Sequence, residues 1–342
     1  MRLLVFGLSI TSSWGNGHAT VYRGLLRALH RLGVEATFVE RDVPWYAGNR
    51  DLSSPDYARV ILYRESERLW DLLDSELRRA DVVLVGSYFP DGIPLADRLA
   101  PRSDLVRLYY DIDTPVTLGA LAREGASQYI RADQLPLFHA VLSFTGGPAL
   151  RELQDRWGAR RAVAFYCGFD PEVHRKVDPD ERFRCRLSYM GTYSPDRHAA
   201  WESLFLRPAA ALSHHRFVLA GPQYPPVELP ANVRHYQHLP PLEHPAFYSS
   251  SDLTLNLTRG PMVAYGYSPS VRLFEAAGCG ACVVSDAWEG MEEVFQVGRE
   301  VLVARDEGEM VRLLSELGPD EVLETGTGDE AREWPPFING QS

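Results

Sequence analysis

The chain has 342 residues, of which 45% are hydrophobic and 24% charged. This length and composition exclude a wholly disordered chain and predict two globular domains of about 150–180 residues. The net charge is −11, and residues 300–342 alone carry 3 basic and 11 acidic side chains. Nucleic acid needs a basic surface and is not an expected partner, whereas a nucleotide diphosphate needs only a helix N-terminus and one or two cations.

The N-terminal run 2–10 carries one charge and has no small-residue cleavage site, so we expect a β-strand there and not a signal peptide. No apolar run reaches the roughly 18 residues of a transmembrane segment. The four cysteines include one C-x-x-C at 279–282, with no second pair or histidine cluster beside it. They are predicted to be packing residues in a reducing cytoplasm, and no metal site is predicted.

Short apolar runs alternate with helix-length segments, which predicts parallel sheets covered by helices on both faces. The expected strands of the first half are 2–10, 35–40, 81–87, 105–112, 140–145 and 162–167. Those of the second half are 185–191, 216–221, 233–238, 253–258, 281–286 and 300–304. The segment 17–32 has the apolar spacing of an amphipathic helix.

This order predicts an α/β protein with two doubly wound, Rossmann-like domains that face each other across a cleft. The expected boundaries are 1–168 for the first domain, 169–184 for a polar linker and 185–318 for the second domain. Residues 319–342 are expected to form an irregular acidic tail. Ligands of such sheets bind outside the carboxyl ends of the strands, so the residues that follow each strand are the candidates for a site.

The loop after the first strand carries Gly15-x-Gly17-x-x-Thr20, with Glu40 near the end of the second strand. This pattern resembles a dinucleotide fingerprint, although its third glycine is a threonine and its first lies about five residues beyond the expected strand. The alternative is that the loop places His18 at a helix start. A helix N-terminus favours neutral imidazole, which suits a general base. A structural role for His18 is equally open.

The strand 105–112 leads into Asp111-Ile-Asp113, followed by a Thr-Pro stop. Carboxylates in this place orient a base, grip sugar hydroxyls or hold a metal. Alternation along a strand sends the two side chains to opposite faces, so only one is expected to face the cleft. The other interpretation is an aspartate that caps the next helix.

The richest segment is 265–286, where a helix start at Ser268 or Ser270 is followed by Arg272 and Glu275. First-turn amides and a guanidinium suit a diphosphate, and a carboxylate one turn later can accept both hydroxyls of a ribose. The competing interpretation is a surface ion pair between Arg272 and Glu275. Earlier turns that follow expected strands contain Gly191, Thr192, Arg197 and Gly221.

These segments together resemble glycosyltransferases of the GT-B architecture, and most closely the bacterial group related to the spore-maturation protein CgeB. The likeness covers about residues 1–317. It rests on WGNGHATVYRGLL (14–26), YYDIDTPVTL (109–118), LSFTGGP (142–148), YMGTYSPDR (189–197) and GYSPSVRLFEAAGCGACVVSD (266–286).

The resemblance implies that the second domain binds a nucleotide-sugar donor. Glu275 would hold the ribose, and Ser268, Ser270 and Arg272 would lie near the diphosphate. The further donor-side candidates are Tyr267, Gly191, Thr192, Arg197 and Gly221. The loop of Trp14, Gly15, Asn16 and Gly17 would lie on the acceptor side, with His18 as the base and Asp111 or Asp113 orienting it.

Two features depart from the family pattern. Retaining members often carry a glutamate where this chain has Tyr267, and GT-B chains usually end in a long helix that 318–342 does not resemble. The resulting prediction is a metal-independent, cytoplasmic glycosyltransferase of hexosyltransferase type. It would use a nucleotide-diphosphate sugar as co-substrate with no bound cofactor, and a small molecule, glycan or other acceptor. No particular oligomeric state is predicted.

His18 as base would give inversion of the sugar; in a retaining mechanism His18 would contact the sugar instead. A hydrolysing sugar-nucleotide epimerase of the same fold is one alternative activity. A non-catalytic protein that binds a sugar nucleotide or a glycan is the other. An NAD enzyme would bind a dinucleotide in place of a nucleoside diphosphate.

Overall fold

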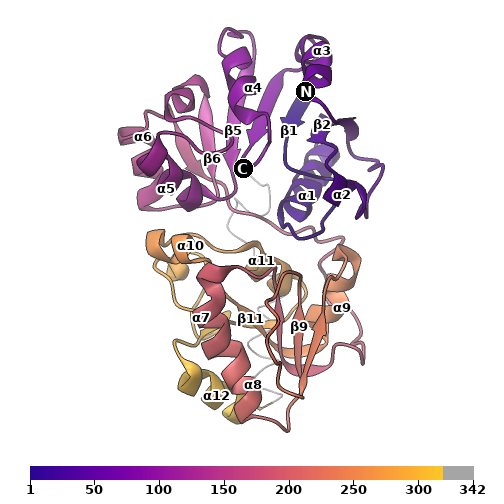
Figure 1. The fold of residues 1–342 in the computed structure, drawn as a ribbon, viewed down its shortest axis with the longest axis vertical. Helices are drawn as coiled ribbons and strands as arrows, with labels where there is room; N and C mark the ends of the chain where they lie inside the picture. Colours follow the sequence, from indigo (N-terminus) through magenta and orange to yellow (C-terminus); the bar gives the residue numbers. More distant parts are fainter. Residues whose placement is uncertain (319–342) are drawn as a thin grey trace. The chain divides into compact units, whose positions relative to one another are not determined.

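The computed structural model describes residues 1–318 and divides the chain into two compact units, the first Met1–Cys167 and the second beginning at Gly168. Each unit is built on one parallel β-sheet with helices packed against it (Figure 1). Within residues 1–318, no helix combines the length and the apolar character that crossing a membrane requires. The expected acidic tail, 319–342, lies outside the described residues.

The first unit contains a seven-stranded sheet in the order β3-β2-β1-β4-β5-β6-β7. All its strand pairs are parallel. The strands are β1 (Arg2–Phe6), β2 (Glu35–Arg41), β3 (Arg59–Tyr63), β4 (Val82–Gly86), β5 (Val106–Asp111), β6 (Ala140–Ser143) and β7 (Ala162–Ala164). The sheet grows from β1 in two directions, so its switch point lies between β1 and β4.

Six α-helices and one 3-10 helix connect these strands. They are α1 (His18–Arg31), α2 (Pro44–Ala47), α3 (Ser66–Leu77), α4 (Gly92–Leu99), α5 (Thr114–Glu124), η1 (Ala132–Leu137) and α6 (Pro148–Asp155). Helix α1 is amphipathic as expected, and it buries Val21, Tyr22 and Leu26. The Tyr22 ring lies over Gly86 of β4, where a Cβ atom would come within 1.8 Å of the phenol oxygen.

Two strand predictions in the first unit were wrong. Strand β3 was not expected, because its apolar run is short. Only Tyr63 of its five residues is buried, as is common for a strand at the edge of a sheet. Strand β1 ends at Phe6 and not at residue 10. The residues that follow Phe6 do not continue the strand, and the side chains of Ser9 and Thr11 hydrogen-bond to the buried Glu40.

The second unit contains a six-stranded parallel sheet in the order β10-β9-β8-β11-β12-β13. Its strands are β8 (Cys185–Met190), β9 (Phe217–Ala220), β10 (Val233–Tyr236), β11 (Ser251–Asn256), β12 (Cys282–Ser285) and β13 (Val301–Val303). All six expected strands are found, with slightly different ends. The switch point of this sheet lies between β8 and β11.

The helical segments of the second unit are short, and three of them follow one another without a break. That run comprises α7 (His198–Trp201), the π-helical η3 (Glu202–Leu206) and α8 (Arg207–Ala211). The others are η2 (Pro195–Arg197), η4 (Pro241–Glu243), α9 (His244–Ser249), α10 (Gly260–Tyr265), α11 (Val271–Gly278), η5 (Met291–Glu293) and α12 (Glu307–Glu316). Helix α12 lies beside α8 (Figure 1), and Met310 and Leu314 of α12 join the core formed with β8, β9 and β11.

The segment 169–184, expected as a linker, belongs to the second unit. Phe169 packs against the C-terminal end of α11, where a Cβ atom on Gly278 would lie 2.6 Å from its ring. His174 from the same segment is buried, with 1% of its surface exposed. All four cysteines are buried, and none of them forms a disulfide.

Candidate functional site

Arg272 occupies the switch point of the second sheet. It lies near the start of α11 and is 8% exposed. Its Nε donates to the carbonyl of Met190 at the end of β8, and its Nη1 donates to Oδ1 of Asn256 at the end of β11, at 2.8 Å. The guanidinium also lies 5.1 Å from the ring centroid of Tyr189. One side chain therefore joins the two strands between which ligands of doubly wound sheets bind.

Two glycines, which follow β8 and β9, leave no side chain beside the guanidinium of Arg272. A Cβ atom on Gly191 would lie 2.8 Å from Nη2 of Arg272. Gly221 has a φ of +137°, and a Cβ atom there would lie 2.0 Å from the carbonyl oxygen of Gly191. Neither position has room for a side chain, and the backbone at Gly191 lies directly against the guanidinium.

The N-terminus of α11 carries no side-chain cap, although Ser268 or Ser270 was expected to supply one. Ser270 is the N-cap residue, but its hydroxyl donates to Asn256 Oδ1 at 2.5 Å. Ser268 is buried, with 1% of its surface exposed. Ser270 therefore does not cap α11 with its side chain, because its hydroxyl is oriented toward the carboxamide of Asn256. A helix start without a side-chain cap is a place where an anionic group can accept from backbone amides.

Glu275 lies one turn after Arg272 and is buried, with 5% of its surface exposed. Both side chains are interior, so the alternative of a surface ion pair between them is wrong. Burial raises the pKa of Glu275 to about 7, against the opposing effects of the Arg272 charge and of a hydrogen bond with Tyr248. A carboxylate so poorly solvated gains unusually much from hydroxyl donors.

Two histidines flank this carboxylate. His174 Nε2 lies 3.7 Å from Glu275 Oε1, and His244 Nδ1 lies 4.0 Å from Oε2. Burial lowers the pKa of His174 to about 4, so its ring is neutral at pH 7. Ligand-type atoms of the three residues lie within 4.8 Å of one another. Within residues 1–318, this cluster is the group of side chains with the composition of a transition-metal site.

The other donor-side candidates have local partners. Arg197 donates to the carbonyl of Thr192, which closes the turn after β8. Tyr267, at φ +49°, packs against Gly290, and its amide donates to the carbonyl of Glu289 at 2.6 Å. Tyr267 thus fills the position of the family's second glutamate with a ring held by a neighbouring loop.

In the first unit, Glu40 holds the loop that follows β1. Its Oε1 accepts from the hydroxyls of Ser9 and Thr11 at 2.9 and 2.7 Å, and its Oε2 accepts from the amides of Ile10 and Thr11 at 2.7 and 3.0 Å. Four donors fill the capacity of the carboxylate. These donors leave no acceptor site on Glu40 for a dinucleotide ribose, which removes one of the two features on which the NAD alternative rested.

The candidate acceptor loop is organised by Asn16. The Asn16 Oδ1 accepts from the amide of Ala19 at 3.1 Å in the first turn of α1, and Nδ2 donates to the carbonyl of Trp14 at 3.3 Å. Gly15 has a φ of +66°, which favours glycine, and Gly17 is the N-cap residue of α1. The loop residues therefore set the start of α1, where His18 is the first residue.

His18 lies at the switch point of the first sheet. Its ring contacts Tyr88, which follows β4, edge to face at a centroid distance of 5.2 Å. Tyr88 has a φ of +62°, a strained conformation for a bulky residue. Burial lowers the pKa of His18, partly offset by the charge of Asp113. Among the described residues, no group hydrogen-bonds to Nδ1 of His18.

The two aspartates after β5 differ in their surroundings. Asp111 is fully buried, and its Oδ1 accepts from Thr117 Oγ1 at 3.0 Å. Burial raises the pKa of Asp111 to about 7. Asp113 is partly exposed, occupies the N-cap position of α5 without a side-chain capping bond, and is the carboxylate whose charge acts on His18. The structure thus places Asp113, and not Asp111, in the electrostatic environment of His18.

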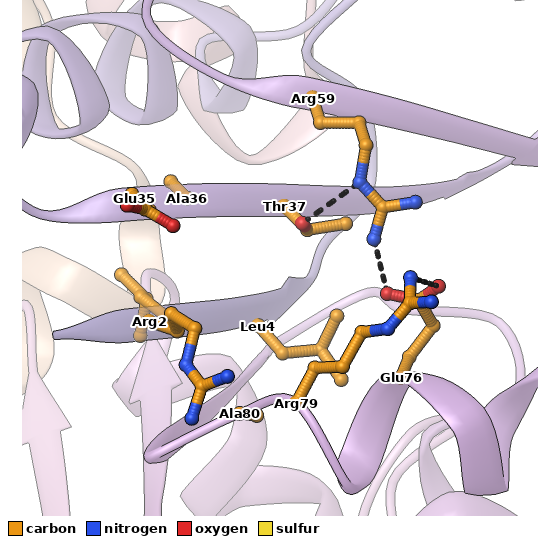
Figure 2. Close-up of a pocket in the computed structure, with 10 residues that line it drawn as sticks. Arg2, Leu4, Glu35, Ala36, Thr37, Arg59, Glu76, Arg79 and Ala80 are labelled. Carbon is orange, nitrogen blue, oxygen red and sulfur yellow. Dashed lines mark hydrogen bonds and ion pairs between the residues drawn. The ribbon is translucent and has the colours of Figure 1, made fainter.

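A pocket of about 370 Å³ lies at the opposite edge of the first sheet, where β1, β2 and β3 begin. Figure 2 shows its charged lining, in which Arg59 is paired with Glu76. The residues are Arg2, Leu3, Leu4, Glu35, Ala36, Thr37, Arg59, Glu76, Arg79 and Ala80. None is a predicted site residue, because the pocket lies at the amino ends of the strands.

Comparison with known proteins supports a glycosyltransferase-like second unit and a GT-B fold. Residues 197–333 match a family model described as glycosyl transferase-like. A search of curated proteins gave no match to the sequence. The family match covers less than half of the chain, and it includes Arg272, Glu275 and Asn256.

Solved structures align along nearly the whole chain. An alpha-glucosyltransferase in complex with UDP and a 13-mer DNA containing an HMU base has a TM-score of 0.69 and 13% identity, over 99% of this chain and 97% of its own. A sucrose-phosphate synthase from Thermosynechococcus elongatus has a TM-score of 0.66 and 14% identity, over 95% and 92%. A putative UDP-N-acetylglucosamine 2-epimerase from Listeria monocytogenes has a TM-score of 0.60 and 12% identity, over 99% and 94%. The chain has the GT-B fold of glycosyltransferases, and its second unit is glycosyltransferase-like in sequence. The likeness to the CgeB-related group stays a prediction.

Sequence reasoning missed Asn256, His174 and His244. Asn256 ends the apolar strand β11, so a carboxamide at a strand end was the available signal. His174 and His244 lie 101 and 31 positions before Glu275 in the chain. No local pattern links residues at such distances, and only the packing of the 169–184 segment and α9 against α11 brings them together.

Proposed function

We propose that this protein transfers a hexose-type sugar from a nucleoside diphosphate donor to an acceptor, without a metal ion or a further cofactor. The observation that carries the proposal is the placement of Arg272 and Glu275 at the switch point of the second sheet. Both are buried, they lie one helical turn apart, and the uncapped amides of α11 precede them. A diphosphate and a ribose are the groups that such a set recognises together.

In this proposal the diphosphate lies against Gly191 and the start of α11. Nη1 and Nε of Arg272 are used by Asn256 and Met190, so the guanidinium is fixed in place and its Nη2, on the side of Gly191, faces the phosphate. Glu275 accepts the ribose hydroxyls. Uridine is the base we propose, because UDP and UDP-N-acetylglucosamine are named for two proteins of the same fold.

The first unit supplies the base. His18 is proposed to take the proton of the acceptor hydroxyl, with Asp113 stabilising the imidazolium that forms. The lowered pKa of His18 keeps its ring neutral and able to accept a proton at pH 7. Direct displacement by an acceptor activated in this way inverts the configuration of the sugar.

A sugar-nucleotide epimerase is the second candidate, because the putative 2-epimerase from Listeria monocytogenes has the same fold. The match of residues 197–333 to a glycosyl transferase-like model favours transfer. The two activities differ in their need for an acceptor: an epimerase turns over its sugar nucleotide alone, whereas a transferase releases UDP in proportion to a glycosylated product.

The test begins with calorimetric titration of UDP, GDP, TDP, ADP and NAD. UDP is expected to bind. In a parallel thermal-shift measurement, UDP at 100 times its dissociation constant should raise the free energy of unfolding by about 2.7 kcal/mol. UDP release from UDP-sugars is then measured with and without a panel of acceptors. Acceptor-dependent UDP release supports the proposal. Conversion of the sugar nucleotide without acceptor would indicate the epimerase, and binding of NAD alone would contradict both.

A further inference from the structure

The cluster of Glu275, His174 and His244 has a layered arrangement. The side chain of His174 is 0% exposed, that of Glu275 is 6% exposed, and that of His244 is 11% exposed. His174 is therefore the most deeply buried of the three side chains, and His244 is the most exposed. Only Glu275 and His244 present any surface to a ligand.

The chain builds this arrangement from three segments. His244 and Tyr248 are four residues apart on α9, so both side chains extend from one face of that helix toward Glu275. His174 ends a turn in which its amide donates to the carbonyl of Asp170 at 2.6 Å. The contact between Phe169 and Gly278 brings this turn against α11.

The position of the hydrogen on the His244 ring follows from its neighbours. His244 Nε2 lies 3.3 Å from the carbonyl of Leu239, which can only accept, so that nitrogen carries the hydrogen. With its hydrogen on Nε2, the His244 ring presents Nδ1 as an acceptor, 4.0 Å from Oε2 of Glu275. A hydroxyl oxygen about 2.8 Å from both atoms spans this separation and can donate to either.

The buried His174 ring has a different relation to the carboxylate. Within residues 1–318, neither ring nitrogen of His174 has a hydrogen-bond partner, and Nε2 is directed at Oε1 across 3.7 Å. Such a buried ring is stabilised by donating its hydrogen to the carboxylate.

We infer that His174 is a positioning residue that holds Glu275, and that His244 shares a ribose hydroxyl with Glu275, so that the pair sets the preference for ribose over 2′-deoxyribose. This inference rests on the proposed nucleotide site. It adds two residues outside the segment that contains Arg272 and Glu275. His244 contacts the ligand, and His174 contacts the carboxylate of Glu275.

A metal ion is the competing occupant of the same cluster. Tetrahedral zinc with bonds of about 2.1 Å brings its ligand atoms to about 3.4 Å from one another. Here the histidines approach different oxygens of Glu275, at 3.7 and 4.0 Å. Tyr248 and Arg272 already favour the charged carboxylate without a cation at its centre. The geometry therefore favours a hydroxyl ligand.

The test measures the affinities of UDP and 2′-deoxy-UDP by calorimetry at pH 8 for the wild type, His174→Phe, His174→Gln and His244→Phe. The wild type is expected to prefer UDP. Both phenylalanine variants should bind UDP about tenfold more weakly than the wild type, but 2′-deoxy-UDP less than about threefold more weakly. The preference for UDP over 2′-deoxy-UDP would then be reduced. His174→Gln keeps a donor and should restore part of it.

His215→Phe is the matched control, because this histidine lies at the amino end of β9, away from the strand ends that form the site. It should leave both affinities unchanged. Folded phenylalanine variants that keep the wild-type preference would overturn the inference, even where Glu275→Ala weakens UDP binding and supports the nucleotide site. Stoichiometric Co²⁺ binding to the wild type that His174→Phe abolishes would also overturn it, in favour of a metal site. A wild type that binds no nucleotide would reject the proposed function and the inference together.

Discussion

Arg272 Nη1 donates to Asn256 Oδ1 at 2.8 Å, and this hydrogen bond links the first turn of α11 to the end of β11. The same oxygen accepts from the hydroxyl of Ser270, and the Asn256 amide donates to Ser285 at the end of β12, at 2.9 Å. A single carboxamide thus joins two neighbouring strand ends to the helix that carries Glu275. Fixing the guanidinium in this way reduces the entropy lost when it binds a phosphate.

The first prediction concerns Glu275. Glu275→Gln keeps the shape and one acceptor, whereas Glu275→Ala removes both, so UDP affinity should fall in the order wild type, Gln, Ala. The loss for Ala should be at least tenfold, or about 1.4 kcal/mol. Calorimetric titration gives these values directly. An Ala variant that binds UDP as tightly as the wild type would place the ribose elsewhere.

The second prediction concerns the pH dependence of binding. The charged form of Glu275 is the better acceptor, and its pKa is raised to about 7, so UDP affinity should rise between pH 6 and pH 8. Two of its neighbours keep their charge in this window, because burial lowers the pKa of His174 to about 4 and raises the pKa of Tyr248. Phosphate groups also titrate near pH 6. The measured quantity is therefore the difference between the wild type and Glu275→Gln, which removes the phosphate contribution; a constant difference would contradict the prediction.

The third prediction concerns Gly191. Alanine at this position would press on Arg272 Nη2, because the added Cβ atom would lie 2.8 Å from it. Gly191→Ala should therefore weaken UDP binding about tenfold while stability falls only modestly, since the guanidinium can move. Gly221→Ala is the informative comparison. Its Cβ would meet a backbone carbonyl at 2.0 Å at a φ of +137°, so it should lower the free energy of unfolding by more than about 2 kcal/mol.

The fourth prediction concerns His18. If His18 is the base, His18→Ala should lower the transfer rate by roughly 10²- to 10⁴-fold with nearly unchanged UDP affinity. Asp113→Asn should lower the rate more than Asp111→Asn, because Asp113 is the carboxylate whose charge acts on His18. Rates of transfer at saturating donor test both statements. A folded His18→Ala protein with the wild-type rate would exclude this histidine from the mechanism.

The fifth prediction concerns stability and Asp111. Burial raises the pKa of Asp111 to about 7, so the native state holds a proton that the unfolded chain has released above about pH 4. The stability associated with this group is therefore fully present below pH 4 and is lost as the pH rises through 7. Asparagine at position 111 cannot titrate. The Tm of Asp111→Asn minus the Tm of the wild type should therefore increase between pH 5 and pH 8. A difference that is independent of pH would indicate that Asp111 does not titrate in this range.

The sequence by itself determined the class of fold, because continuous apolar strands alternating with helices can be buried only in parallel sheets covered on both faces. It also located the segments from which the candidate site is built: the loop before His18, the end of β5 and the start of α11. These signals are local, since a glycine, an apolar run or a strand-end carboxylate is visible within a few residues. The edge strand β3 was missed because its apolar run, residues 60–63, is only four residues long.

The tertiary structure decided the environment of each side chain. It placed four donors on Glu40, separated the buried Asp111 from the partly exposed Asp113, and gave the hydroxyl of Ser270 to Asn256. It also brought His174 and His244 to the two sides of Glu275. Burial, pKa and hydrogen-bond partners depend on atoms from segments far apart in the chain. They follow from how α9, α11 and the strand ends pack, which no local spacing of residues determines.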